Sequence, residues 1–202
     1  MIFPVACIVE GHGEVQAVPV LIRRIALEMF PGMSLRVLPP LRVSRFKLVK
    51  KGELERAVEL AARKTGGMGA VLVLIDSEGD CPAQTGPALL SRACATRSDL
   101  PIGVVLAKHE YEGWFLAAAE SLRGRRGLRQ DITAPPDPEA IRGAKEWLSD
   151  RMEPGMKYHE VLDQPALTAV FDFAAARRTD SFDKCYREIV RLLEVLQQSA
   201  AP

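Results

Sequence analysis

The sequence predicts an α/β fold in which helices flank a mainly parallel sheet. Three short apolar runs, rich in branched residues, are each followed by a segment with helical periodicity. Runs of this length with turn signals on both sides are typical of strands that are buried on both faces of a parallel sheet. All three runs also end in carboxylates, and three acidic strand ends are hard to attribute to chance.

The first strand is predicted from Phe3 to Val9 and is followed by Glu10. Two glycines, Gly11 and Gly13, then favour a tight turn into a helix from about residue 14 to 30, which carries apolar residues on one face. A short strand over residues 34–38 follows. The loop from residue 39 to 51 is basic, and a helix over residues 52–64 ends at a pair of glycines.

The central strand runs from Val71 to Ile75 and leads directly into Asp76, Glu78 and Asp80. Ligands bind at the carboxyl ends of the strands in open α/β sheets. Three acids at alternate positions repel one another unless a cation lies between them. Oxygen-only ligands suit Mg²⁺ or Mn²⁺. The alternative is an acidic turn in which a glycine supplies a positive φ.

After a helix over residues 86–97, a third strand is predicted over residues 101–107, and Glu110 and Glu112 follow it. They would lie on the same sheet edge as Asp76, although the helix dipole alone also favours acids at a helix start. We divide the chain into a catalytic core (1–122), a basic, proline-rich linker (123–137) and a small C-terminal helical extension packed on the core (138–202). Helices are predicted in the extension at residues 138–151, 165–177 and 181–197.

The composition excludes several classes of protein. The net charge of the 202-residue chain is only +1, so bulk charge predicts no partner. No apolar run of about 20 residues could span a membrane, and the start does not resemble a signal peptide. Four scattered cysteines without a C-x-x-C pair favour reduced thiols, and we expect a cytoplasmic protein. There is no P-loop, and Gln16 occupies the third glycine place of a dinucleotide-binding loop.

Two stretches carry a family resemblance. Residues from Ile8 to Glu14 (IVEGHGE) resemble the first motif of the Toprim domain, which occurs in topoisomerases, bacterial primases, recombination-repair proteins and OLD-family nucleases. Residues from Asp76 to Pro82 (DSEGDCP) resemble the second motif, a strand that ends in D-x-D. The whole chain resembles a compact bacterial Toprim-like family of unknown function that is related to the OLD nucleases; the Toprim-like part covers roughly the first 120 residues.

The resemblance implies a Toprim fold and roles for the acids. Glu10 corresponds to the Toprim glutamate, which binds metal or acts in acid–base catalysis, and Asp76 corresponds to the first metal aspartate. Glu78 stands where the second aspartate is usual, which lengthens that ligand. The predicted catalytic residues are Glu10, Asp76 and Glu112, with Glu110 as an alternative to Glu112. The predicted ligands of one or two Mg²⁺ or Mn²⁺ ions are Glu10, Glu14, Asp76, Glu78, Asp80 and Glu112.

The leading hypothesis is therefore a Mg²⁺- or Mn²⁺-dependent nuclease that hydrolyses phosphodiester bonds of DNA or RNA. The resemblance further implies a separately encoded ATPase partner and a role in defence against foreign DNA. The predicted nucleic-acid contacts are Arg42, Arg45, Lys47, Lys50, Lys51, Lys108 and Lys157. One alternative is a non-catalytic Toprim-like module that binds nucleic acid or protein, and another is a phosphatase that acts on small molecules.

Overall fold

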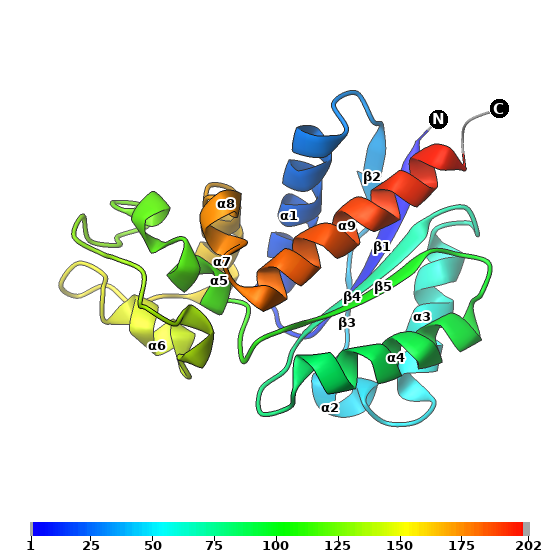
Figure 1. Cartoon of the computed structure of the whole chain (residues 1–202), viewed down its shortest axis with the longest axis horizontal. Coiled ribbons are helices and arrows are strands. Elements are labelled where there is room, and N and C mark those ends of the chain that lie inside the picture. Colours follow the sequence, from blue (N-terminus) through cyan, green and yellow to red (C-terminus); the bar gives the residue numbers. More distant parts are fainter. Residues whose placement is uncertain (1, 200–202) are drawn as a thin grey trace.

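The structure is a computed structural model, which describes residues 2–199. Figure 1 shows a twisted sheet with helices on both faces. The strands are β1 Phe3–Val9, β2 Leu35–Val37, β3 Leu41–Arg42, β4 Ala70–Asp76 and β5 Ile102–Ala107. Their order is β2-β1-β4-β5, β3 also pairs with β1, and every pair is parallel. The predicted α/β fold with a mainly parallel sheet is therefore confirmed.

The two faces of the sheet carry separate hydrophobic layers. Alternate residues of β1 and β4 point to opposite faces, so that Cys7 and Leu72 join one layer and Ile8 and Val73 join the other. One face is covered by α1 Glu14–Met29 and α9 Asp180–Gln198, and the other by α3 Glu53–Lys64 and α4 Pro82–Thr96. All four helices occupy predicted positions, although α4 begins four residues before the predicted residue 86.

The C-terminal part shares the core of the sheet. Ile189, Leu192 and Leu193 of α9 belong to the same buried cluster as β1 and β4. Residues Leu128 and Ile132 of the predicted linker are buried in this cluster too. The intervening short helices are α5 Gly113–Ala117, α6 Ala144–Ser149, α7 Glu160–Thr168 and α8 Phe173–Ala176, with 3-10 turns at Ala119–Leu122 and Pro138–Ala140.

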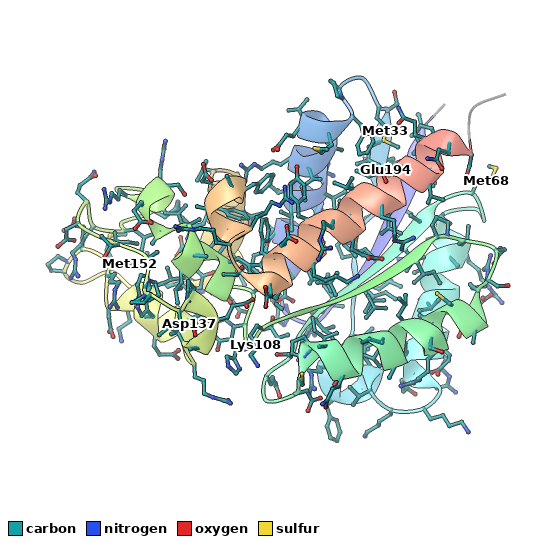
Figure 2. All side chains as sticks on the ribbon, viewed as in Figure 1. Met33, Met68, Lys108, Asp137, Met152 and Glu194 are labelled. Atoms are coloured by element: carbon teal, nitrogen blue, oxygen red, sulfur yellow. The ribbon has the colours of Figure 1, made fainter. Side chains whose placement is uncertain are left out.

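Figure 2 shows the side chains of this region, with Met152 and Asp137 in the part of the molecule beside the sheet and Lys108 at the junction. The aromatic side chains of this region contact one another edge to face in series. The centroid of Trp114 lies 5.2 Å from that of Phe182, which in turn lies 5.2 Å from Phe171. The Trp114 indole nitrogen donates a 2.8 Å hydrogen bond to Ser181 Oγ, so the partner of this buried polar atom comes from the start of α9.

Three predictions of secondary structure were wrong. The predicted helix over 165–177 is two helices, because Asp172 accepts a 2.6 Å hydrogen bond from the Ala175 amide and caps the second one. The predicted helix over 138–151 is a 3-10 turn and a short α6, separated by Gly143 at φ 74°. The loop over 39–51 contains β3 and a short helix, α2 Arg45–Leu48. Within residues 2–199, none of the helices is both long and apolar enough to cross a membrane.

A close contact with α7 explains the glycine before α1. Gly13 has an ordinary φ of −65°, so the constraint on this position is space. A Cβ atom there would lie 2.1 Å from the Gln164 side-chain oxygen and 2.8 Å from the Glu160 carbonyl oxygen. We expect Gly13→Ala to lower the free energy of unfolding by about 1–3 kcal/mol in urea denaturation, because overpacking must displace α7.

The matched control for this prediction is Gly79→Ala. A Cβ atom at Gly79 would meet nothing within 4 Å, so this variant should keep the stability of the parent chain. Equal losses in both variants would contradict the steric explanation.

Candidate functional site at the carboxyl edge of the sheet

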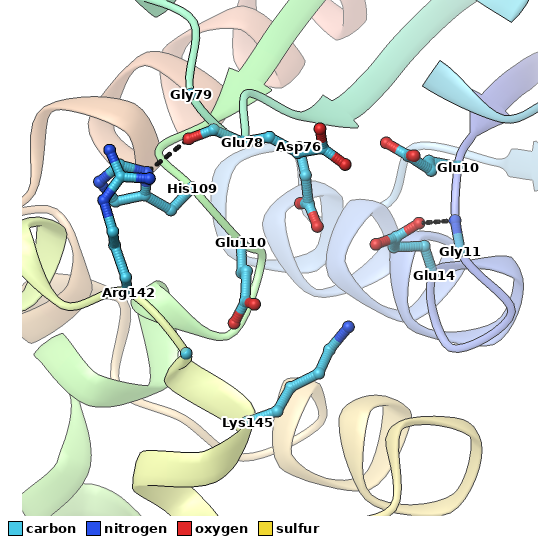
Figure 3. Close-up of a pocket in the computed structure, with 11 residues that line it drawn as sticks. Glu10, Gly11, Glu14, Asp76, Glu78, Gly79, His109, Glu110, Arg142 and Lys145 are labelled. Atoms are coloured by element: carbon cyan, nitrogen blue, oxygen red, sulfur yellow. Dashed lines mark hydrogen bonds between the residues drawn. The ribbon is translucent and has the colours of Figure 1, made fainter. Parts of the chain in front are cut away.

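The predicted acidic strand ends meet at one edge of the sheet. In the parallel register Val9 lies opposite Leu74 and Asp76 lies opposite Ala107, so β1, β4 and β5 end side by side. A cavity of about 390 Å³ opens at this edge (Figure 3). The residues that line it are Glu10, Gly11, Glu14, Asp76, Glu78, Gly79, His109, Glu110, Arg142, Gly143 and Lys145. Four of the six predicted metal ligands therefore share one cavity with two basic residues.

Glu10 and Glu14 come from the turn between β1 and α1. Glu10 directly follows β1, and its Oε2 atom is buried and has no hydrogen-bond partner among residues 2–199. Glu14 is the first residue of α1, is 5% exposed, and accepts a hydrogen bond from the Gly11 amide. Burial raises the pKa of both carboxyls, and their mutual repulsion raises the pKa of Glu14 further.

Asp76 is the last residue of β4 and lies at the centre of the acidic group. Its Oδ1 atom accepts a 2.9 Å hydrogen bond from the Tyr111 amide, which joins the ends of β4 and β5. Burial raises the pKa of Asp76 well above its ordinary value, and the charges of Glu14, Glu112 and Glu10 raise it further. The negative charge at this edge is therefore strong enough to favour either bound protons or a bound cation.

Lys145 faces these acids from the opposite wall, and Figure 3 shows its amino group pointing into the cavity. Its Nζ atom lies 3.0 Å from Glu160 Oε2. Burial lowers the pKa of Lys145, but the charges of Glu112, Glu160 and Asp76 outweigh burial and raise it above its ordinary value. The cavity thus presents a fixed cation opposite a group of carboxylates.

Glu110 fixes the wall that carries Lys145. Its Oε2 atom accepts a 2.8 Å hydrogen bond from the Ala144 amide at the start of α6. Lys145 was not among the site residues predicted from the sequence. No spacing in the sequence indicates a role for Lys145 at the site, because α6 reaches the site through contacts with residues distant in the sequence.

Glu112 is fully buried and does not line the cavity. Its Oε1 atom accepts hydrogen bonds from the Tyr158 hydroxyl at 2.9 Å and from Gln164 Nε2 at 3.2 Å, while Oε2 has no partner in the described part of the chain. Burial raises the pKa of Glu112 to about 7, because it outweighs the opposite effects of Lys145 and Tyr158. Its predicted roles in catalysis and metal binding stay predictions, and its position suits a residue that holds α7 and Lys145 near the site.

Glu78 and Asp80 are more exposed than the other acids and share one partner. Arg45 of α2 forms an ion pair with Asp80, and its Nη1 atom lies 3.7 Å from Glu78 Oε2. Glu78 lines the cavity and Asp80 does not. The Arg45 side chain is 13% exposed. Arg45, which was predicted to contact nucleic acid, is therefore mostly occupied in joining α2 to the acidic loop.

A pair of left-handed residues shapes the rim of the cavity. Glu78 has φ 48° and His109 has φ 60°, a backbone conformation that residues other than glycine rarely adopt. The Glu78 amide donates to the His109 carbonyl at 3.2 Å, and His109 Nδ1 lies 2.5 Å from the Glu78 carbonyl. Such conformations are typical of functional sites, where the surrounding structure holds them in place.

The remaining basic residues divide into two groups. Arg42, Lys47, Lys50 and Lys51 are exposed on and around α2. Lys108 lines a second, mainly apolar cavity of about 500 Å³, formed by the start of α4, β5 and the start of α9, and Lys157 is exposed in the loop before α7. Neither Lys108 nor Lys157 lines the acidic cavity.

The residue types in the acidic cavity fit a hard cation, since the donors are carboxylate oxygens and the buried Glu10 Oε2 has no partner among the residues that the structure describes. The side chains do not form a complete coordination shell: in the part of the chain from residue 2 to 199, no group of three or more His, Cys, Asp and Glu residues is arranged to hold a metal ion. Mg²⁺ keeps several waters and often uses only one or two carboxylates, so the donor set still fits.

The fold and the site define an α/β protein with a parallel sheet and an acidic cavity at its carboxyl edge. Residues 9–189 match the family described as "Domain of unknown function (DUF4276)", and the chain belongs to this family. Among curated proteins and solved structures, none matches the chain.

Proposed function

We propose that the protein is a Mg²⁺- or Mn²⁺-dependent nuclease that hydrolyses phosphodiester bonds in DNA or RNA. The observation that carries this proposal is the convergence of Glu10, Glu14 and Asp76 in one cavity that Lys145 faces from the other side. These three acids would otherwise repel one another in a partly buried place, and a divalent cation removes that repulsion.

Each part of the cavity has a distinct role in this proposal. Glu10, Glu14 and Asp76 would hold the cation, which neutralises charge on a phosphate and activates water when it is bound. Lys145 stays protonated, because its pKa is raised, and stabilises the charge that develops on the scissile phosphate. Glu110 and Glu160 position Lys145 through α6 and the ion pair.

The resemblance of the two acidic motifs to the Toprim domain supports the same activity, since OLD-family nucleases carry such motifs. It is also the basis for proposing a separately encoded ATPase as a partner and a role in defence against foreign DNA. Both of these finer proposals rest on analogy with related nucleases rather than on a residue of this chain.

A second candidate function is a non-catalytic module that binds nucleic acid or protein. It is favoured by one observation: within residues 2–199 the side chains as they stand include no group of three that could hold a metal ion. Thermal unfolding with and without Mn²⁺ separates the two functions. A cation that binds the native state should stabilise a nuclease by about 2.7 kcal/mol at 100 times its dissociation constant.

The direct test is cleavage of labelled single-stranded and duplex oligonucleotides with Mn²⁺ or Mg²⁺. We expect cleavage that stops when EDTA is added. Lys145→Met should slow it by about 100-fold or more, the size expected for loss of one charge-stabilising group. Lys64→Met, at an exposed lysine of α3 outside the cavity, should leave the rate unchanged. If the protein cleaves nothing, either alone or together with an ATPase encoded nearby, the proposed activity is contradicted.

A further inference from the structure

Helix α2 presents an exposed aromatic ring among basic side chains. Phe46 is 72% exposed, whereas the next apolar residue of this helix, Leu48, is completely buried and anchors α2 on the core. Lys50 Nζ lies 3.9 Å from the centroid of the Phe46 ring. We call the group formed by Phe46, Arg42, Lys47, Lys50 and Lys51 the α2 platform.

The α2 platform is joined directly to the acidic cavity. Arg45, the residue before Phe46, forms an ion pair with Asp80 and lies 3.7 Å from Glu78, which lines the cavity. The Val43 amide donates a 2.8 Å hydrogen bond to the Val9 carbonyl, immediately before Glu10. The α2 platform is therefore attached to the strand end and to the loop that carry acids of the cavity.

Hydrogen bonds from α4 also hold the C-terminal end of α2. Arg92 of α4 donates to the Val49 carbonyl at 3.0 Å and to the Lys50 carbonyl at 2.7 Å. The same guanidinium binds both carboxylate oxygens of Glu55, at 2.8 and 2.9 Å. Because both ends of α2 are tied down, the backbone that carries Phe46 is preorganised, and less conformational entropy is lost when a ligand binds there.

We propose that the α2 platform binds single-stranded nucleic acid, with one unpaired base stacked on Phe46 and the flanking phosphates close to the lysines. This proposal rests on the proposed function and names its substrate class. An exposed aromatic ring amid cations suits an unstacked base and its backbone, because base–aromatic stacking works with every base while basic side chains follow the phosphates. A paired duplex keeps its bases stacked internally and offers no such face.

Binding of single-stranded and duplex oligonucleotides, of DNA and of RNA, tests this inference in EDTA, where cleavage is absent. We expect single strands to bind more tightly than duplexes of the same length. Phe46→Ala should weaken single-strand binding by about tenfold, the loss expected for one stacked base, with no change for the duplex. Phe46→Trp should retain the affinity because it retains a stacking face.

The matched control is Leu27→Ala on α1, since Leu27 is 76% exposed and lies outside the platform. The inference is overturned if Phe46→Ala and Leu27→Ala behave alike, if no nucleic acid binds, or if Phe46→Ala changes the oligomeric state and leaves binding intact, which would make the ring a contact with a second copy. Phe46-dependent binding without metal-dependent cleavage would reject the nuclease and retain the platform.

Discussion

Replacing Asp76 by asparagine should reduce metal-dependent cleavage by about 100- to 1,000-fold, since loss of a metal ligand forfeits several kcal/mol of transition-state stabilisation. Asparagine can still accept the 2.9 Å hydrogen bond from the Tyr111 amide through its oxygen, so the local fold should persist. The variant should also lose most of the Mn²⁺-dependent rise in melting temperature. Cleavage rates and melting curves, each with and without Mn²⁺, measure both effects.

The metal-free state of the same variant gives an independent test. Asp76 has a pKa raised by burial and by the charges of Glu14, Glu112 and Glu10. Removing its charge should therefore keep or increase the stability in EDTA at neutral pH. The control is Asp131→Asn, at an exposed acid paired with Arg129. If Asp76→Asn cleaves like the parent chain, or if both variants lose activity equally, Asp76 has no role at the reacting phosphate.

Replacing Glu112 by glutamine should make the metal-free protein more stable at pH 8 and less sensitive to pH. The folded-state pKa of Glu112 is raised from 4.5 to about 7. A carboxyl with a raised folded-state pKa destabilises the protein increasingly as the pH rises from the unfolded-state value to the folded-state value. The pKa shift corresponds to a destabilisation of about 3 kcal/mol. This destabilisation should be absent below pH 4.5 and fully developed above pH 7.

Glutamine can still accept hydrogen bonds from Tyr158 and Gln164, so the gain should not be offset by a broken contact. Urea denaturation in EDTA from pH 4.5 to pH 8 measures the effect, and Glu120→Gln provides a comparison at an exposed acid whose pKa is lowered by the Ala134 amide. If the parent chain gains stability from pH 4.5 to 7 relative to the Glu112→Gln variant, the change in stability with pH has the opposite sign to the expected one. That result would contradict the burial of an ionisable Glu112.

Local patterns were sufficient to predict the strands and most of the long helices. The apolar runs that became β1, β4 and β5 are short, branched and bounded by turn residues, and the structure confirms them with shifts of about one residue. Helix breaks were predicted less well. The break between α7 and α8 depends on Asp172, whose capping role is visible only once the Ala175 amide is in place.

The short α2 helix was missed for a related reason. Its pattern is mainly basic, and it is held by the buried Leu48 and by contacts of Arg45 and Arg92 with residues distant in the sequence. The sequence therefore indicated a basic loop, whereas the structure has a short helix with an exposed aromatic ring, Phe46.

The sequence by itself determined that acids would end three parallel strands, and that Glu10 and Asp76 would therefore meet at one edge of the sheet. That follows from chain direction, because parallel strands ending on the same side bring their following residues together. Only the tertiary structure decided that Lys145 would face these acids, that Glu112 would turn into the core and that Arg45 would pair with Asp80. Those outcomes depend on how α2, α6 and α7 pack, and packing is set by contacts between distant residues that no local pattern contains.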